Sequence, residues 1–331
     1  MPCPKVIALV SGGLDSLLAA RLVQTQRADV HALHFLMPFS PRGASAQGVE
    51  EAARRFGWEL EIERLGEPFV EMVRYPQYGY GKQMNPCLDC RVFTLSRARV
   101  RMEQMGAVAV VTGEVLGQRP MSQRRDAMRR VERESGLEGR LLRPLSAKHL
   151  KPTLAEQEGV IDREGLLDLS GRSRKPQMAL AEKLGITQYP TPAGGCLLAD
   201  AGFARRLRDL FAHDEATLEA IQLLKVGRHF RLGAGQKVIA GRNEAENLEL
   251  ERMVDGDVVR GTAAEVGSSM VMLFGEADEA ALGAVARICA RYCAHRDRER
   301  VPIRLRKGPD PEGTVLSVSP MTDGELSQVR V

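Results

Sequence analysis

The chain lacks the features that mark secreted and membrane proteins. Its 331 residues contain no apolar run long enough to cross a bilayer, so we expect no contact with a membrane. Six cysteines in a chain of this length do not make the disulfide framework of a small secreted domain. The first expected strand begins at Lys5, which leaves no room for a signal peptide and predicts a cytoplasmic protein.

The chain also has no large excess of either charge, because its formal net charge is only +4. The basic residues nevertheless gather in two stretches. Residues 119–151 hold ten Lys and Arg against four Asp and Glu, and residues 287–307 hold eight against two. Such stretches favour a polyanionic partner through the release of counterions, and a solvated surface is the equally good alternative for each.

Strands and helices are expected to alternate along the first two hundred residues. Apolar patterns predict strands at 5–10, 30–35, 59–62, 108–113 and 140–144, and helices at 14–24, 48–56 and 91–104. This order is typical of an α/β fold, a doubly wound parallel sheet with helices on both faces. Ligands of such sheets bind at the carboxyl ends of the strands.

The rest of the chain has a different pattern, and we place the domain boundary between residues 203 and 204. Helices are expected at 203–211, 215–224, 244–253 and 278–293, and strands at 226–232, 237–242, 257–261 and 269–274. The tail from Gly308 is expected to fray or to end on an edge strand. Residues 204–331 are therefore predicted to form a smaller α+β domain, with RNA as a candidate partner.

The most informative segment joins the first strand to the first helix. Its residues are Ser11, Gly12, Gly13, Leu14, Asp15 and Ser16. A strand that turns through two glycines into a helix presents backbone N–H groups to a polyphosphate, and the serines add hydroxyl donors. Asp15 would repel phosphates unless it holds Mg²⁺ or an N–H group. An ordinary strand-to-helix turn is the alternative interpretation.

Neither the dinucleotide fingerprint nor a Gly-Lys-Ser/Thr loop occurs at this point. The hexapeptide resembles instead the pyrophosphate loop (PP-loop) of ATP pyrophosphatases, enzymes that adenylate a carbonyl oxygen and release pyrophosphate. The resemblance implies that ATP binds at Ser11–Ser16, with Mg²⁺ near Asp15.

Three cysteines form a second candidate site. Cys87 and Cys90 have Cys-x-x-Cys spacing just before a predicted helix, whose N-terminus is expected to lower the pKa of their thiols. Cys196 follows Gly194-Gly195 in an irregular segment. Three thiols without a nearby histidine fit an iron–sulfur cluster with one free iron better than a structural zinc, which takes four protein ligands. A redox dithiol and cysteines that only fill the core are the alternatives.

Further motifs point to a family. The Gly-Glu-x-x-Gly-Gln element at 113–118, together with Ser122-Gln123 and residues 141–145, resembles the catalytic domain of tRNA 4-thiouridine synthetases, and so does His34-Phe35 after the second strand. This resemblance covers about the first two hundred residues. It implies that His34, Phe35, Gly113 and Gln118 join the loop in binding ATP.

The cysteine pattern resembles that of tRNA 2-thiouridylases and of iron–sulfur-dependent thiolases. This resemblance implies that Cys87, Cys90 and Cys196 hold a 4Fe–4S cluster or carry sulfur as a persulfide. Residues 1–203 would then be a PP-loop ATP-binding sulfurtransferase domain.

These observations predict an ATP-dependent sulfurtransferase that acts on RNA, with a tRNA uridine as the expected substrate. Asp15, Cys90 and Cys196 are the expected catalytic residues, and free sulfide, a cysteine desulfurase or a carrier protein is the expected sulfur donor. Two alternatives are ATP-dependent sulfur or nitrogen transfer to a small molecule, and an RNA-binding protein with a regulatory ATP site.

Overall fold

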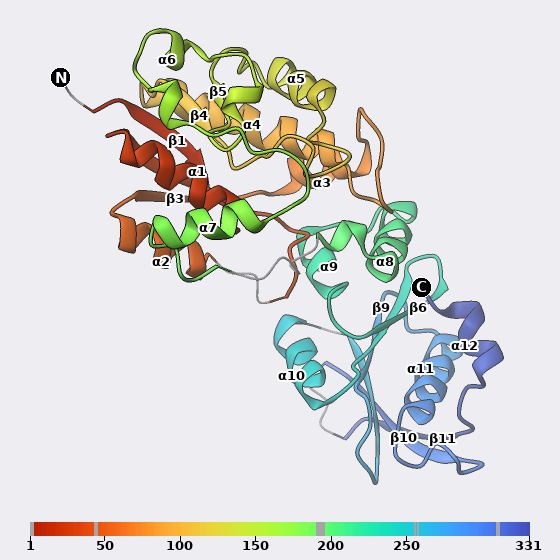
Figure 1. Ribbon diagram of the computed structural model, residues 1–331. Helices are drawn as coiled ribbons and strands as arrows, with labels where there is room; N and C mark the ends of the chain where they lie inside the picture. Colours follow the sequence, from red (N-terminus) through yellow and green to blue (C-terminus); the bar gives the residue numbers. More distant parts are fainter. Residues whose placement is uncertain (1–2, 43–45, 190–195, 255, 257, 309–311) are drawn as a thin grey trace. The chain divides into compact units, whose positions relative to one another are not determined.

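The computed structural model describes residues 3–42, 46–189, 196–254, 256, 258–308 and 312–331 (Figure 1). The chain divides into two compact units, Met1–Asp200 and Ala201–Val331, each with its own sheet. Among the described residues, no helix combines the length and the hydrophobicity that a membrane span requires.

The N-terminal unit has the predicted α/β fold. Its five strands are ordered β3-β2-β1-β4-β5, and all their pairings are parallel. In chain order its elements are β1 (Lys5–Leu9), α1 (Leu14–Thr25), β2 (Asp29–Leu36), α2 (Gln47–Phe56), β3 (Glu59–Arg64), α3 (Glu67–Arg74), α4 (Cys87–Gln104), β4 (Ala109–Val111), α5 (Arg125–Glu134), β5 (Leu141–Leu142), η1 (Ala147–His149), α6 (Leu154–Gln157), η2 (Arg163–Gly165), α7 (Lys175–Lys183) and η3 (Leu197–Ala199).

Alternation of side chains along β1 explains why helices cover both faces of this sheet. Val6 and Ala8 are buried in one apolar cluster together with residues of α1, α2 and α7. Ile7 points the other way, into a second cluster that contains Leu95 of α4 and Val131 of α5. Since both faces are buried, the carboxyl edge of the strands is left as the place for a ligand.

The C-terminal unit has the predicted α+β character. Its six-stranded antiparallel sheet is ordered β11-β10-β8-β9-β7-β6. In chain order its elements are α8 (Ala201–Ala212), α9 (Leu218–Leu223), β6 (Arg228–Gly233), β7 (Gln236–Ala240), α10 (Glu244–Met253), β8 (Val259–Ala263), β9 (Val271–Phe274), α11 (Glu279–Arg291), β10 (Val301–Lys307), β11 (Thr314–Val318) and α12 (Asp323–Val329). The tail ends on the edge strand β11 and then on α12.

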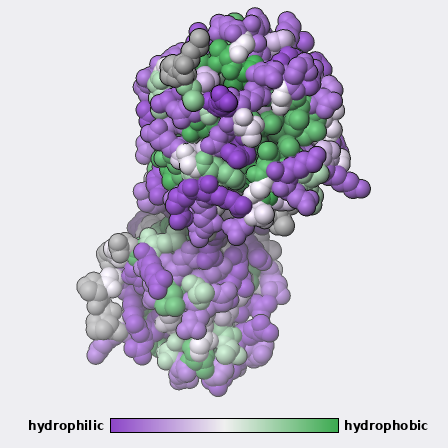
Figure 2. Space-filling model, turned by 60° about the vertical axis from the view of Figure 1, so that its left-hand side comes forward, coloured by the Kyte–Doolittle hydropathy of each residue, from purple (hydrophilic) through white to green (hydrophobic). Residues whose placement is uncertain are grey.

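The core of this unit lies mainly under α11. Val285 and Ile288 of that helix are fully buried against Val238, Leu273 and Ile303 of the sheet. Figure 2 shows hydrophilic residues over most of the visible surface of both units, with hydrophobic residues reaching the surface at several places.

Candidate active site

The phosphate loop forms the turn between β1 and α1. Gly12 has φ +80°, a conformation that glycine adopts without strain, and Gly13 is the residue before the first helical one. Ser16 closes the turn, because its hydroxyl donates to the Gly13 carbonyl at 2.8 Å and accepts the Ser11 N–H at 3.1 Å. Within the described residues no backbone partner is found for the N–H groups of Leu14 and Asp15 in the first turn of α1, which suits an anion.

Gly113 packs directly on this loop. A Cβ atom at position 113 would lie 2.4 Å from the carbonyl carbon and oxygen of Asp15 and 2.5 Å from the nitrogen of Ser16. No real side chain tolerates such contacts with backbone atoms, so the position after β4 requires glycine. The contact fixes the end of β4 against the start of α1.

One carboxylate oxygen of Asp15 has a hydrogen-bond partner, and the other has none within the described residues. Its Oδ2 accepts a hydrogen bond from Gln118 Nε2 at 3.0 Å. Its Oδ1 is buried and has no hydrogen-bond partner within the described residues. A buried carboxylate oxygen without a donor suits a cation, and oxygen ligands are those that Mg²⁺ prefers. The donor set therefore fits the predicted Mg²⁺ at Asp15.

The structure separates His34 from Phe35. His34 is buried, and its Nδ1–H donates to the carbonyl of Val10 at 2.7 Å, directly before the phosphate loop. Phe35 points to the opposite face of the sheet and packs in the cluster that contains Leu33 and Leu95. Side chains at neighbouring strand positions cannot line the same ligand face, so only His34 reaches the loop side.

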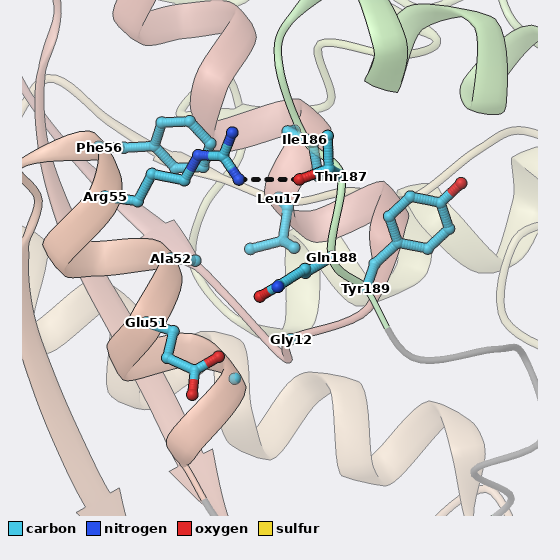
Figure 3. Close-up of a pocket in the computed structure, with 11 residues that line it drawn as sticks. Gly12, Leu17, Glu51, Ala52, Arg55, Phe56, Ile186, Thr187, Gln188 and Tyr189 are labelled. Atoms are coloured by element: carbon cyan, nitrogen blue, oxygen red, sulfur yellow. Dashed lines mark hydrogen bonds between the residues drawn. The ribbon is translucent and has the colours of Figure 1, made fainter.

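A cavity of about 410 Å³ begins at the same loop (Figure 3). Gly12 lines one end, and Leu17 and Phe56 contribute apolar surface. At its rim the guanidinium of Arg55 donates to the hydroxyl of Thr187 at 3.0 Å, which joins α2 to the segment after α7. The cavity gives a ligand at the loop additional room between these two elements.

The thiol site is assembled from two distant segments. Helix α4 begins at Cys87 rather than at Arg91, where the sequence placed it, so that Cys87 and Cys90 lie in its first turn. Cys196 directly precedes η3. Two backbone hydrogen bonds hold η3 in place, from Leu197 N–H to the Phe39 carbonyl at 3.4 Å and from the N–H of Met84 to the Leu198 carbonyl at 3.0 Å.

The three thiols share one electrostatic environment. Burial is the main reason why the pKa of Cys90 is raised to about 12, and the neighbouring Cys196 and Cys87 thiols add to this increase. Burial likewise raises the pKa of Cys87 and of Cys196. Arg91 and Arg119 act in the opposite direction without outweighing it. The expectation that the helix N-terminus would lower these pKa values is therefore wrong, because desolvation is the larger effect.

The described residues contain no group of three or more His, Cys, Asp and Glu side chains placed to hold a metal ion. This arrangement argues against a preformed single-ion site at the three thiols. A 4Fe–4S cluster is larger than one ion, so its thiolate ligands stand further apart than those of a single ion. Three thiols whose charges influence one another fit such a cluster, and the nearby Asp89 carboxylate is taken up by the N–H groups of Gln77 and Tyr78. Gly194 and Gly195, which precede Cys196, lie outside the described residues.

A buried ion-pair network connects the thiol helix to the strand ends. The carboxylate of Glu114 is 2% exposed and lies 3.4 Å from Arg91 Nε and 3.0 Å from Arg143 Nε. Burial opposes its ionisation, but the two guanidinium groups outweigh burial and hold the pKa of Glu114 below its ordinary value. Arg143 also pairs with Glu132 at 2.9 Å, so this member of the basic stretch 119–151 is not available to a polyanion.

Gly113 and Glu114 together join the two candidate sites. Gly113 touches the phosphate loop, and the adjacent Glu114 binds Arg91, which follows Cys90 directly in α4. Two consecutive residues after β4 thus fix both the loop and the helix that carries two of the thiols.

Two structural residues of the site were missed in the sequence. Glu114 stands in the Gly-Glu-x-x-Gly-Gln motif, but its pairing with Arg91 and Arg143 depends on residues far apart in the chain. Asp89 is buried between the two α4 cysteines, where its Oδ1 accepts the Gln77 N–H at 2.7 Å and the Tyr78 N–H at 3.3 Å. For Asp89 the sequence did hold a signal, namely an acidic residue between the two cysteines of the Cys-x-x-Cys element.

Two families match the two units separately. Residues 3–151 match the family described as "Thiamine biosynthesis protein (ThiI)". Residues 227–330 match the family described as "NFACT protein RNA binding domain".

Curated relatives match the N-terminal part. The tRNA-specific 2-thiouridylase MnmA of Desulfosudis oleivorans is 32% identical over 114 residues, which are 33% of this chain and 32% of that protein. A Staphylococcus aureus protein named "Probable tRNA sulfurtransferase" is 30% identical over 121 residues, which are 34% of this chain and 28% of that protein. The chain thus spans about a third of the length of these relatives.

A solved structure described as a 4-thiouridine synthetase–RNA complex with bound ATP is also similar. The alignment covers 55% of this chain and 52% of the solved chain, with 20% sequence identity and a TM-score of 0.36. The predicted resemblance to tRNA-thiolating enzymes is confirmed: the N-terminal unit is similar to the ThiI family over residues 3–151, and the C-terminal unit is similar to the NFACT RNA-binding domain over residues 227–330.

Proposed function

We propose that the chain is an ATP-dependent sulfurtransferase that thiolates RNA, with a tRNA uridine as its substrate. The observation that carries the proposal is the connection through Gly113 and Glu114, which holds a phosphate loop and a thiol helix at fixed positions. In this proposal residues 1–203 form the catalytic domain, and residues 204–331 form a domain that binds RNA.

The first step activates the base. The carbonyl oxygen of the uracil attacks the α-phosphorus of ATP, pyrophosphate leaves, and an adenylated base results. The N–H groups at the start of α1 and the Ser11 hydroxyl bind the polyphosphate. Asp15 would hold Mg²⁺, which neutralises charge on the leaving pyrophosphate. Activation is required because oxygen leaves a pyrimidone carbon poorly, whereas AMP leaves readily.

The second step replaces oxygen by sulfur. A sulfur nucleophile attacks the activated carbon, and AMP departs with the former carbonyl oxygen. Sulfide needs no change of oxidation state. A persulfide on Cys90 or Cys196 delivers its terminal sulfur to the base, and the second thiol then breaks the S–S bond and forms a disulfide with the first. A cluster bound by Cys87, Cys90 and Cys196 would supply an iron with an open position for sulfide.

Replacement of Asp15 by Asn tests the first step. Only the charge directed at the metal is removed, so pyrophosphate release should fall by about 10²–10³-fold while the fold survives. Release is measured with bulk tRNA as substrate, and circular dichroism checks the fold. Release at the wild-type rate would contradict the role of Asp15.

Sulfur transfer itself is tested by mass spectrometry of tRNA nucleosides after incubation of the purified protein with ATP and with either a sulfide source or a persulfide donor such as a cysteine desulfurase with cysteine. Appearance of a thiouridine that depends on both ATP and protein is expected. Absence of every thionucleoside, with active protein by the pyrophosphate test, would contradict RNA as substrate.

A second candidate is sulfur transfer to a small molecule. The name of the family matched by residues 3–151 refers to thiamine, which is a small molecule. The same loop and thiols would serve, and pyrophosphate release would then proceed without RNA. Stimulation of release by tRNA therefore distinguishes the two candidates.

A further inference from the structure

The two faces of the C-terminal sheet are covered differently. Helix α11 packs against five strands, from β7 to β11. On the other face, the apolar cluster draws its strand residues from β7 and β9 through Ile239 and Met272, beneath Leu250 of α10. Within the described residues, β8, β10 and β11 contribute nothing to that second cluster.

The register of β8, β10 and β11 shows which side chains point away from α11. In β10 the residues Ile303 and Leu305 are buried against α11, so Arg304 and Arg306 between and after them point to the other face. Arg306 lies opposite Arg260 of β8, and Arg304 lies opposite Val315 of β11. Val315 is 49% exposed, which shows that this face is open to solvent.

Three arginines on this open face keep their positive charge. Arg304 donates to the Glu312 carbonyl at 3.3 Å, and Arg260 donates to the Val254 carbonyl at 3.0 Å. A carbonyl is uncharged, so neither bond neutralises a guanidinium. Arg306 is exposed and forms no ion pair within the part of the chain that the structure describes.

Two other basic residues of the same stretch are neutralised by ion pairs. Arg287 and Arg291 of α11 pair with Glu325 and Asp323 of α12, at 2.8 Å and 2.7 Å. Arg287 and Arg291 therefore add little positive potential, whereas Arg304 and Arg306 of β10 bring theirs to the face away from α11.

From these observations we propose that the open face of β8, β10 and β11, with Arg260, Arg304 and Arg306, is the surface on which this chain binds RNA. The inference rests on the proposed function in taking RNA as the partner, and it adds the surface and the mode of contact. A row of guanidinium groups that no carboxylate neutralises within the described residues complements a chain of phosphates.

The composition of this face specifies the contact further. Its side chains beside the arginines are Thr262, Pro302, Val315 and Ser317. None of them is aromatic, so the face offers no ring on which a base could stack. Binding is therefore directed at the sugar–phosphate backbone and depends little on base sequence, which leaves the choice of the modified base to the N-terminal unit.

Two matched double variants of the full chain test the surface: Arg304→Gln with Arg306→Gln, and Arg287→Gln with Arg291→Gln as the control. The dissociation constant for bulk tRNA is measured between 50 and 200 mM salt, the range used for such slopes. The open-face variant should flatten the plot of log K against log salt by about 1.5, because each lost phosphate contact removes about 0.7–0.9. The control should keep the wild-type slope.

The single variant Arg306→Glu is expected to fold, because the residue is exposed and its replacement leaves the core intact. A loss of binding in this variant is therefore not explained by unfolding. It should weaken tRNA binding more than Arg306→Gln does. A wild-type slope in the open-face variant, or a flattened slope in the α11 control, would overturn the proposed surface.

The same preparations distinguish failure of the surface from failure of the function. Wild-type protein that thiolates tRNA while the open-face variants bind it unchanged would refute the surface alone. Wild-type protein that neither binds nor thiolates tRNA would refute the proposed function and, with it, the surface.

Discussion

The phosphate loop and the thiol site differ in how they are built. The loop is made from six consecutive residues and is closed by its own Ser16, so most of its geometry is local. The thiol site joins the start of α4 to Cys196, and its third member is held through η3 by single backbone bonds. We infer that the loop is ready for its ligand before binding, whereas the thiols are brought to their working geometry by what they bind.

Among the variants that distinguish the two sites, those at the three thiols should have the largest effect. Cys87→Ala, Cys90→Ala and Cys196→Ala should each lower tRNA thiolation by about 10³-fold or more, because a shared site fails when one member is lost. Pyrophosphate release should stay close to wild type, since the loop uses none of these residues. Nucleoside mass spectrometry and pyrophosphate assays measure the two steps, with Cys3→Ala, an exposed cysteine, as the control.

The same three variants separate the two forms of sulfur delivery. A cluster predicts brown protein with about four irons per chain after anaerobic purification, and loss of iron in every variant. A persulfide predicts colourless protein and a mild effect of Cys87→Ala. Zinc in place of iron, or full activity of Cys87→Ala, would contradict the cluster.

Gly113→Ala, in contrast, should impair the phosphate loop more than the thiol site. The new methyl group would meet the backbone of Asp15 at 2.4 Å and must displace it. A shift of about 1 Å at a reacting group costs about 10²-fold in rate, so pyrophosphate release should fall by that factor. Gly283→Ala is the control, because a Cβ there meets nothing within 4 Å. A larger loss of bound iron than of pyrophosphate release would contradict the separation of the two sites.

Glu114→Gln should show its effect in stability. Removal of one charge from a buried network leaves guanidinium groups without their counter-charge, which typically costs about 3–5 kcal/mol. Denaturant unfolding of the variant measures this loss. Glu103→Gln breaks an exposed pair with Arg99 at 2.7 Å and should cost no more than about 0.5 kcal/mol.

The stability that Glu114 provides over Gln at position 114 should be lost in acid. The pKa of Glu114 in the folded chain lies below the ordinary value of 4.5. Its stabilising contribution is therefore complete above that pH and is lost as the pH falls through the folded pKa. The difference in unfolding free energy between the native chain and Glu114→Gln should shrink below about pH 4.5. A difference that stays constant there would show that Glu114 stabilises by shape alone.

Local patterns in the sequence predicted the loop and most of the elements around it. The strand before Ser11, the helix after it and the parallel class of the sheet follow from apolar periodicity and glycine placement. Helix α5 was missed because only Ala127, Met128 and Val131 face the core, and the rest of its residues are mostly charged. A stretch of this kind is indistinguishable in sequence from a basic surface segment.

Features that depend on distant partners could not be predicted. The raised pKa values of the thiols follow from desolvation in the folded chain, and local reasoning from the helix N-terminus gave the wrong direction. The roles of Glu114 and Arg143 depend on the meeting of α4, β4 and β5. His34 and Phe35 are neighbours in sequence, yet strand alternation sends them to opposite sides of the sheet.

The late position of Cys196 has a consequence for how the protein is made. The last strand of the N-terminal sheet ends at Leu142, 54 residues before Cys196. At about 5–20 residues per second, synthesis of that interval takes several seconds, during which the sheet and the loop can fold while the third thiol is still missing. In the proposed function, sulfur transfer is thus the last capability that the nascent N-terminal unit acquires, after the phosphate loop is already in place.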